Sequence, residues 1–188
     1  MTLSLVTSPA AANANSYATI AEADAYHEGH LYSSLWTVAA SGEKIAALVM
    51  ATRLLDGISG GWTGVASTAE QALCWPRQGM LSLNGFAIAS GEIPARLKCA
   101  EAEYARQLLG SDLTETNTIL AQGISRLKAG SVELAFKEPM SQYDAAIPSN
   151  RALAAMVPDA VKALLVPSWL VDPRVQDGEL SGFVCEAI

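Results

Sequence analysis

Two segments of this chain carry apolar residues at the spacing of an α-helix, and each ends near a glycine. The first, residues 41–57, opens on Ser41, a suitable cap, and the second, residues 94–110, opens on Pro94, which suits a first helical turn. Apolar residues make up 51% of the chain, many of them alanines, which favours close helix packing. We therefore predict a mainly α fold, a small bundle of about four helices. The stripe residues are Ile45, Leu48, Val49, Thr52 and Leu55, then Leu97, Ala100, Tyr104 and Leu108.

Two shorter helices complete the predicted bundle. Thr19 followed by Glu22 forms the pattern of a capping box, which predicts a helix over about residues 19–29. A last helix is expected over about residues 149–165, where Pro158 either splits it or starts it.

Residues 123–137 change from helical spacing to alternation. Apolar Val132, Leu134 and Phe136 alternate with other residues after Gly130, a pattern that predicts a β-hairpin. A lone hairpin is marginally stable. We therefore expect the hairpin to pack against the helices or against a neighbouring subunit.

A long connection over residues 58–92 separates the two strongest helices. Structureless connections longer than about 12–15 residues are usually functional or disordered. This one is too apolar to be disordered, so we expect an ordered excursion. Its large apolar residues are Trp62, Leu73, Trp75, Leu81, Leu83, Phe86 and Ile88.

Within the excursion, Trp75, Pro76 and Arg77 are adjacent. We predict that Trp62, Trp75 and Pro76 form a clamp that holds the excursion on the bundle, because Pro76 restricts the backbone while the indoles supply buried area. Arg77 is then expected to make a bidentate contact with a carboxylate, either of its own chain or of the next subunit.

The N-terminal end of the chain is predicted to be flexible or extended, and the C-terminal end to be extended. Residues 1–15 are interpreted as an N-terminal arm, residues 16–167 as the helical domain, and residues 168–188 as an extended C-terminal tail. We expect the apolar residues of the tail to enter grooves on a partner, although the tail could instead fold back on its own core. They are Trp169, Leu170, Phe183, Val184 and Ile188.

The composition argues against several function classes. A net charge of −7 opposes binding to a phosphate backbone, and the bases are scattered. No phosphate loop, nucleophile elbow or metal-ligand set is recognisable, and the longest apolar run is too short for a membrane helix, so we expect no enzyme, cofactor, metal or membrane partner. On helix 94–110 we expect Arg96, Glu103 and Arg106 to be solvated.

Binding to single-stranded DNA is the main alternative from the residues themselves. Trp62, Trp75 and Phe86 could stack on bases while Arg77 and Arg96 meet phosphates. Burial of the aromatic residues against the bundle is the competing interpretation.

Four strings in order suggest a family. They are "NSYATIAEADAY", "KIAALVMATRLLD", a Trp-x-Gly followed by "QALCWPRQG", and "IPARLKCAEAEYARQLL". In that order and spacing the chain resembles the head–tail connector, or adaptor, proteins of tailed bacteriophages, over roughly residues 13–137. Such sequences are also labelled DnaT-like single-stranded-DNA-binding domains.

The resemblance implies a structural virion protein. Twelve copies would form a homo-oligomeric ring under the portal protein and continue the DNA channel to a tail, stopper or nozzle protein. Genomic DNA would pass through the lumen without specific binding. The protein would lie at the head–tail interface of the virion, and in the host cytoplasm during assembly. The tail from residue 168 would reach toward the portal.

Overall fold

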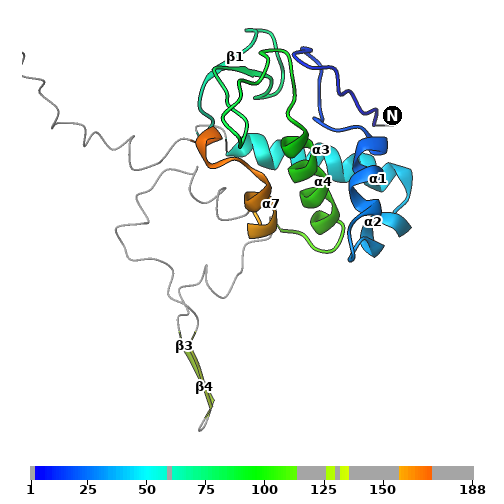
Figure 1. The fold of residues 1–188 in the computed structure, drawn as a ribbon. Helices are drawn as coiled ribbons and strands as arrows, with labels where there is room; N and C mark the ends of the chain where they lie inside the picture. Colours follow the sequence, from blue (N-terminus) through cyan, green and yellow to red (C-terminus); the bar gives the residue numbers. More distant parts are fainter. Residues whose placement is uncertain (1–2, 59–60, 114–125, 130–131, 136–156, 171–188) are drawn as a thin grey trace, which may run out of the picture.

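The computed structural model describes residues 3–58, 61–113, 126–129, 132–135 and 157–170. Within these ranges the protein is mainly helical, as predicted (Figure 1). The helices are α1 (Ile20–Glu28), α2 (Ser34–Val38), α3 (Ser41–Gly57), α4 (Ala95–Leu108) and α7 (Asp159–Leu164), followed by the 3-10 turn η2 (Pro167–Trp169). The strands are β1 (Val65–Ala66), β2 (Arg77–Gln78), β3 (Arg126–Ala129) and β4 (Val132–Ala135).

Helix α4 is the centre of the helical body, because α1, α2, α3 and α7 all contact it. Its main partner is α3, and the two predicted apolar stripes face each other in this interface. Leu48 and Leu55 of α3 and Leu97 of α4 are completely buried there. Burial of this kind contributes roughly 1.5–3 kcal/mol for each large apolar side chain.

The helix starts follow local hydrogen-bonding rules. At α1 the capping box is confirmed: the Glu22 backbone N–H donates to Thr19 Oγ1 at 3.2 Å, and the Thr19 N–H donates to Glu22 Oε2 at 2.8 Å. At α3 the predicted cap is wrong by one residue. Ser41 is already helical, Ala40 is the cap residue, and the Ala40 N–H donates to Glu43 Oε2 at 2.8 Å. A backward bond from Glu43 therefore replaces the expected serine cap.

Two short helices differ from the expectations. The single-turn helix α2 was not predicted, and it buries Trp36 against the body. Helix α7 begins at Asp159, directly after Pro158, so this proline starts the helix. The preceding part of the predicted helix, residues 149–156, lies outside the described residues.

The predicted hairpin is confirmed for the described part of residues 123–137. Strands β3 and β4 are antiparallel neighbours, with Arg126 opposite Ala135 and Ala129 opposite Val132.

The excursion over residues 58–92 is ordered where the structure describes it. Strands β1 and β2 pair with each other, and Leu81 bridges to Ala87 further along. The Trp75–Pro76 peptide bond is cis. The excursion forms one end of the body in Figure 1.

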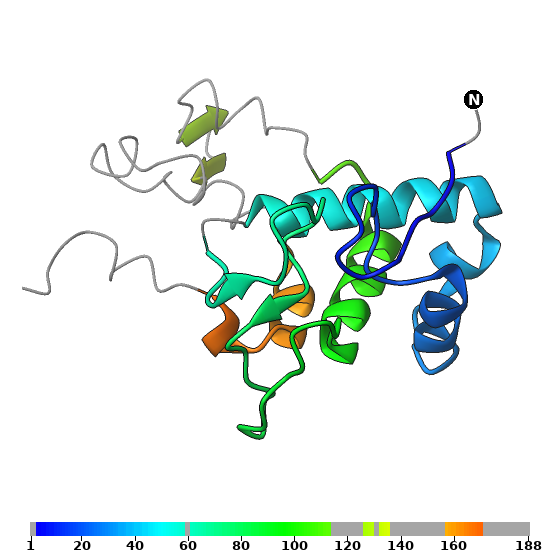
Figure 2. The ribbon, with the colours of Figure 1, turned by 90° about the horizontal axis from the view of Figure 1, so that it is seen from above.

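The N-terminal arm is fastened to the excursion. Asn15 folds the arm back on itself, because its Oδ1 accepts the Val6 N–H at 2.7 Å and its amide donates to Ser4 O at 2.8 Å. The Ala72 N–H donates to Ala11 O at 3.2 Å, so arm and excursion lie side by side (Figure 2). The described residues of the arm therefore pack on the body instead of projecting from it.

The charged face expected on α4 is partly wrong. Glu103 is only 3% exposed, because Arg106 Nη2 donates to its Oε1 at 2.5 Å and His30 Nε2 lies 3.4 Å from its Oε2. Arg106 covers this carboxylate, and it holds the pKa of Glu103 below its usual range against the effect of burial. Arg96 is engaged with α7, as described below.

Candidate functional site

Three indole rings meet where the excursion touches the helical body. Trp75 is 1% exposed, and its ring centroid lies 5.8 Å from that of Trp62 and 5.0 Å from that of Trp169. The interplanar angles are 89° and 61°, which are edge-to-face arrangements. We call this group, together with Tyr17, Asp56 and Arg77 beside it, the tryptophan junction.

The junction binds the segment after α7 into the body. Trp169 Nε1 donates to Leu81 O at 2.7 Å, and the Thr63 N–H donates to Trp169 O at 2.8 Å. Leu170 forms a β-bridge with Trp62. These contacts explain why residues 168–170 are not an extended tail.

Trp169 and Leu170 therefore anchor the segment to its own chain, which is the alternative in which the tail folds back on its own core, and a contact with a portal protein stays a prediction. The structure gives the physical reason, since Trp62 and Trp75 already provide an apolar site for the third indole. The remaining residues proposed for portal contact, Phe183, Val184 and Ile188, lie outside the described residues.

Tyr17 and Asp56 connect three segments at the junction. The Tyr17 hydroxyl donates to Asp56 Oδ1, and the Cys74 N–H donates to Asp56 Oδ2 at 3.1 Å. The Trp75 N–H in turn donates to the Tyr17 oxygen at 3.3 Å. Burial raises the pKa of Asp56 above its ordinary value, and burial together with Asp56 raises the pKa of Tyr17. The tyrosine therefore keeps its proton and serves as a structural donor.

Arg77 points into its own chain. Its Nε donates to Thr63 O at 2.6 Å, its Nη1 to Cys74 O at 3.0 Å, and its Nη2 to Gly64 O at 3.0 Å and Trp62 O at 3.4 Å. These acceptors are carbonyls, whereas the sequence led us to expect a carboxylate. All three guanidinium nitrogens thus hold the excursion together, and a contact of Arg77 with another subunit stays a prediction.

Gly64, whose carbonyl accepts from Arg77, has a backbone conformation that requires glycine. Its φ is +69°, in the left-handed region, and a Cβ at this position would lie 2.4 Å from Gln78 O. Only glycine therefore fits directly before β1, next to Gln78 of β2, which gives the Trp-x-Gly pattern of residues 62–64 a structural reason.

We expect Arg77→Lys to lower the free energy of unfolding by about 2 kcal/mol, because lysine cannot reach several carbonyls and hydrogen bonds to charged groups contribute about 1.5–3 kcal/mol each. Urea denaturation followed by circular dichroism measures this change. Arg53→Lys, on the exposed side of α3, is the matched control and should leave the midpoint unchanged. Equal denaturation midpoints for the two variants would show that the several guanidinium donors of Arg77 are not needed for stability.

A second buried polar cluster was not expected from the sequence. Glu101 of α4 is completely buried, and its carboxylate accepts hydrogen bonds from Ser16 Oγ at 2.5 Å and Thr52 Oγ1 at 2.6 Å. The backbone N–H groups of Ala18 and Tyr17 also donate to it, at 2.6 and 3.3 Å. Burial raises the pKa of Glu101 to about 7, while these hydrogen bonds act in the opposite direction.

A signal for this cluster exists in the sequence. Glu101 follows Leu97 by four positions, so it lies on the apolar face of its helix. An acid on a buried stripe needs several donors, and Ser16 and Thr52 supply them from two other segments.

The histidines have structural partners. The His27 ring nitrogen Nε2 lies 3.1 Å from Ala102 O, and burial lowers the His27 pKa, which favours a neutral ring that donates to this carbonyl. His30 contacts Glu103. Within the residues that the structure describes, no cluster of three histidine, cysteine or acidic side chains is arranged to hold a metal ion. Among the described helices, none combines the length and the apolarity required to span a bilayer.

Fold and site together define a small, mainly helical protein in which a long excursion is fixed to a helical body by buried tryptophans and internal hydrogen bonds. A family model matches residues 1–177, and its description reads "Putative DnaT-like ssDNA binding protein". The chain belongs to this family. No curated protein and no solved structure was found to match it.

Proposed function

We propose that this chain is a structural virion protein, a head–tail connector that forms a ring under the portal and continues the DNA channel. The observation that carries the proposal is where its motif residues lie. Tyr17, Asp56, Trp75 and Arg77, from three of the four strings on which the resemblance rests, contact one another or the same short segments. These residues thus build the architecture of the subunit, as an assembly component requires.

Most of the side chains suited to bind single-stranded DNA are buried or hydrogen-bonded within the chain. Trp62 and Trp75 are buried and cannot stack on a base without opening the core. Arg77 binds carbonyls of the excursion, and Arg96 donates to Leu164 O at 2.9 Å and Ala163 O at 3.0 Å. Among the aromatic and arginine candidates, Phe86 alone is freely accessible, with 73% of its surface exposed.

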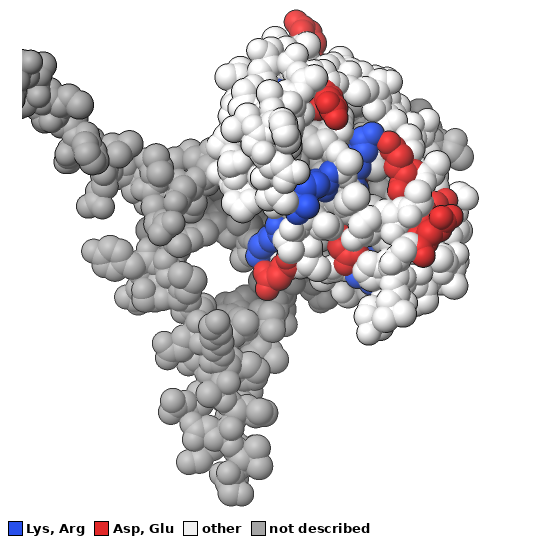
Figure 3. Space-filling view, viewed as in Figure 1, with Lys and Arg blue, Asp and Glu red and all other residues white. Residues whose placement is uncertain are grey.

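The surface charge also suits a conduit. Lys98 pairs with Glu22 at 2.6 Å, and Lys162 pairs with Asp159 at 3.3 Å. Basic groups therefore lie beside acidic ones on the face shown in Figure 3. A net charge of −7 lets duplex DNA slide past, because few condensed counterions would be released on contact.

In this role the protein needs no cofactor and catalyses no reaction. Its partners are further copies of itself, the portal protein and a tail, stopper or nozzle protein, and it resides at the head–tail interface of the virion.

Mixing the purified chain with the portal protein from the same genome tests the proposal. We expect a portal-bound ring in electron micrographs and little retention of duplex DNA at low salt. A chain that stays monomeric and does not bind the portal would refute the connector role. Tight non-specific binding of duplex DNA by the assembled ring would refute its role as a DNA channel.

Binding of single-stranded DNA is the second candidate function, and the family description favours it. Fluorescence anisotropy with a labelled oligonucleotide distinguishes the two. A DNA-binding role requires affinity that falls steeply with salt, because each neutralised phosphate releases counterions. It also requires Phe86→Ala to weaken binding, since stacking contributes about 1–3 kcal/mol per base. Under the connector proposal, we expect neither effect.

A further inference from the structure

Exposed large apolar side chains gather in two places on this protein. Of the nine such residues in the described ranges, four lie within residues 31–38 and three within residues 81–86. We call the first group, on and before α2, the α2 patch, and the second, in the excursion, the loop patch. The α2 patch consists of Leu31, Tyr32, Leu35 and Val38, and the loop patch of Leu81, Leu83 and Phe86.

Both patches belong to stretches without charge. Residues 31–42 contain no acidic or basic side chain, and neither do residues 78–91. Charged residues are depleted in the cores of protein–protein interfaces, whereas a phosphate backbone needs basic contacts. The chemistry of both patches therefore fits an apolar protein surface.

The loop patch is held in a fixed shape. The Ser82 N–H donates to Phe86 O at 2.7 Å, the Gly85 N–H to Ser82 O at 2.9 Å, and the Phe86 N–H to Ser82 Oγ at 3.1 Å. Leu81 O accepts the Trp169 indole, which ties the loop to the tryptophan junction. A preorganised loop loses little conformational freedom on binding, so its exposed side chains are suited to docking.

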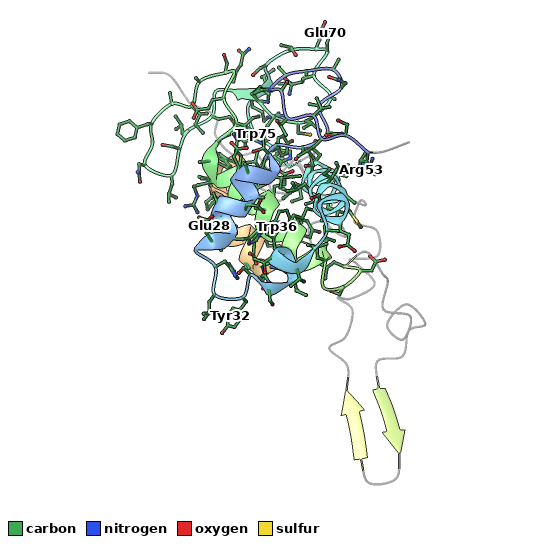
Figure 4. All side chains as sticks on the ribbon, turned by 90° about the vertical axis from the view of Figure 1, so that its right-hand side faces the viewer. Glu28, Tyr32, Trp36, Arg53, Glu70 and Trp75 are labelled. Carbon is green, nitrogen blue, oxygen red and sulfur yellow. The ribbon has the colours of Figure 1, made fainter. Side chains whose placement is uncertain are left out.

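The α2 patch lies at the end of the helical body away from the excursion, and the loop patch belongs to the excursion. Figure 4 shows Tyr32 at one end of the helical body, while the excursion, with Glu70, forms the opposite end. The side chains of both patches stay exposed in the single chain, so the patches do not cover one another within it. Between copies they can meet, and such head-to-tail contacts generate rings when the rotation closes.

We propose that the loop patch of one copy docks on the α2 patch of the next copy. This inference rests on the proposed ring function and names the surfaces that would form the ring. Phe86, 73% exposed, and Tyr32, 72% exposed, are the aromatic residues at the centre of the contact. Aromatic side chains of this kind commonly contribute most of the binding energy of an interface.

Charge substitutions test the contact on the full chain. We expect Phe86→Asp or Tyr32→Lys alone to weaken self-association by more than about tenfold in analytical ultracentrifugation, because a desolvated charge has no partner. A mixture of the two variants should recover association, since Phe86 of one variant can dock on Tyr32 of the other, and the two new charges face each other at the alternate interface. Arg53→Gln changes the net charge by the same single unit on α3, away from both patches, and should associate as the wild type does (Figure 4).

Disulfide cross-linking supplies a second measurement. A chain with both Tyr32→Cys and Phe86→Cys should form a ladder of linked oligomers on oxidation, and neither single variant should do so. Association of Phe86→Asp and Tyr32→Lys at wild-type strength, or a wild-type chain that stays monomeric, would overturn the contact. If the variants still form portal-bound rings at wild-type strength, the connector role stands and the proposed contact is refuted. If association depends on both patches but the oligomers do not bind the portal, the contact stands and the connector role is refuted.

Discussion

Replacing Trp75 with alanine is expected to lower the free energy of unfolding by about 3–5 kcal/mol, the usual cost of truncating a buried aromatic residue. Trp75 is 1% exposed and contacts both Trp62 and Trp169, so the cavity would open where the excursion and the segment after α7 meet. A loss of this size is a large fraction of the total stability of a small domain. Urea denaturation followed by circular dichroism gives the value directly.

Phe86→Ala is the matched control, because Phe86 is an aromatic residue of the same excursion but is largely exposed. Measured at concentrations where the chain is monomeric, its unfolding free energy should stay within about 0.5 kcal/mol of the wild type. Trp75→Ala should also speed proteolysis of the excursion at temperatures where the helices persist. Similar stabilities for the two variants would mean that Trp75 does not hold the excursion.

The helices were predictable because their signals are local. The stripe from Leu48 to Leu55 repeats with the helical period, and such a stripe is buried whatever its partner is. The same holds for the capping box at Thr19, where both hydrogen bonds connect residues three apart. The start of α3 shows the limit of local signals, because Glu43 caps Ala40 although Ser41 is the more usual cap residue.

The junction was only partly predictable because its contacts join distant segments. The sequence indicates that Trp75 is buried, but the position of Trp169 depends on a site that exists only after Trp62 and Trp75 have come together. Arg77 illustrates the same limit. Its partners are backbone carbonyls at and near Gly64. Because every residue has such a carbonyl, the sequence does not show which of them Arg77 binds.

Acidic residues on α4 were the least predictable part of the site. Glu101 and Glu103 are both buried, although acids are rarely buried without partners. Their donors come from Ser16 and Thr52 in one case and Arg106 in the other. Residue type alone favours exposure for both acids, whereas three-dimensional pairing decides where they lie.

Glu101 should make stability depend on pH in the direction opposite to that of a salt-bridged acid. Its pKa in the folded protein is raised to about 7 from an ordinary value of 4.5. Because the folded state binds this proton more tightly than the unfolded state does, the contribution is fully present below about pH 4.5 and is lost as pH rises to about 7. The difference corresponds to on the order of 3 kcal/mol.

The hydroxyl groups around Glu101 allow both protonation states. Ser16 Oγ lies 2.8 Å from Ala18 O as well as near the carboxylate, and Thr52 Oγ1 lies 3.0 Å from Leu48 O. When Glu101 is protonated, it can donate to one of these hydroxyls, which then turns its own hydrogen to the nearby carbonyl. A glutamine can use the same arrangement without titrating.

We therefore expect Glu101→Gln to remove the fall in stability between pH 4.5 and 7 and to be at least as stable as the wild type above pH 7. Glu101→Leu should instead cost about 3 kcal/mol or more, because the N–H groups of Tyr17 and Ala18 lose their acceptor. Unfolding free energies at intervals across this range measure both effects.

Other titrating groups, such as His27 and Asp56, are common to both chains, so the difference between the wild-type and Glu101→Gln curves isolates the single carboxyl group. Parallel curves would show that Glu101 carries no proton in the folded protein near neutral pH, and that its four donors outweigh the cost of burying its charge.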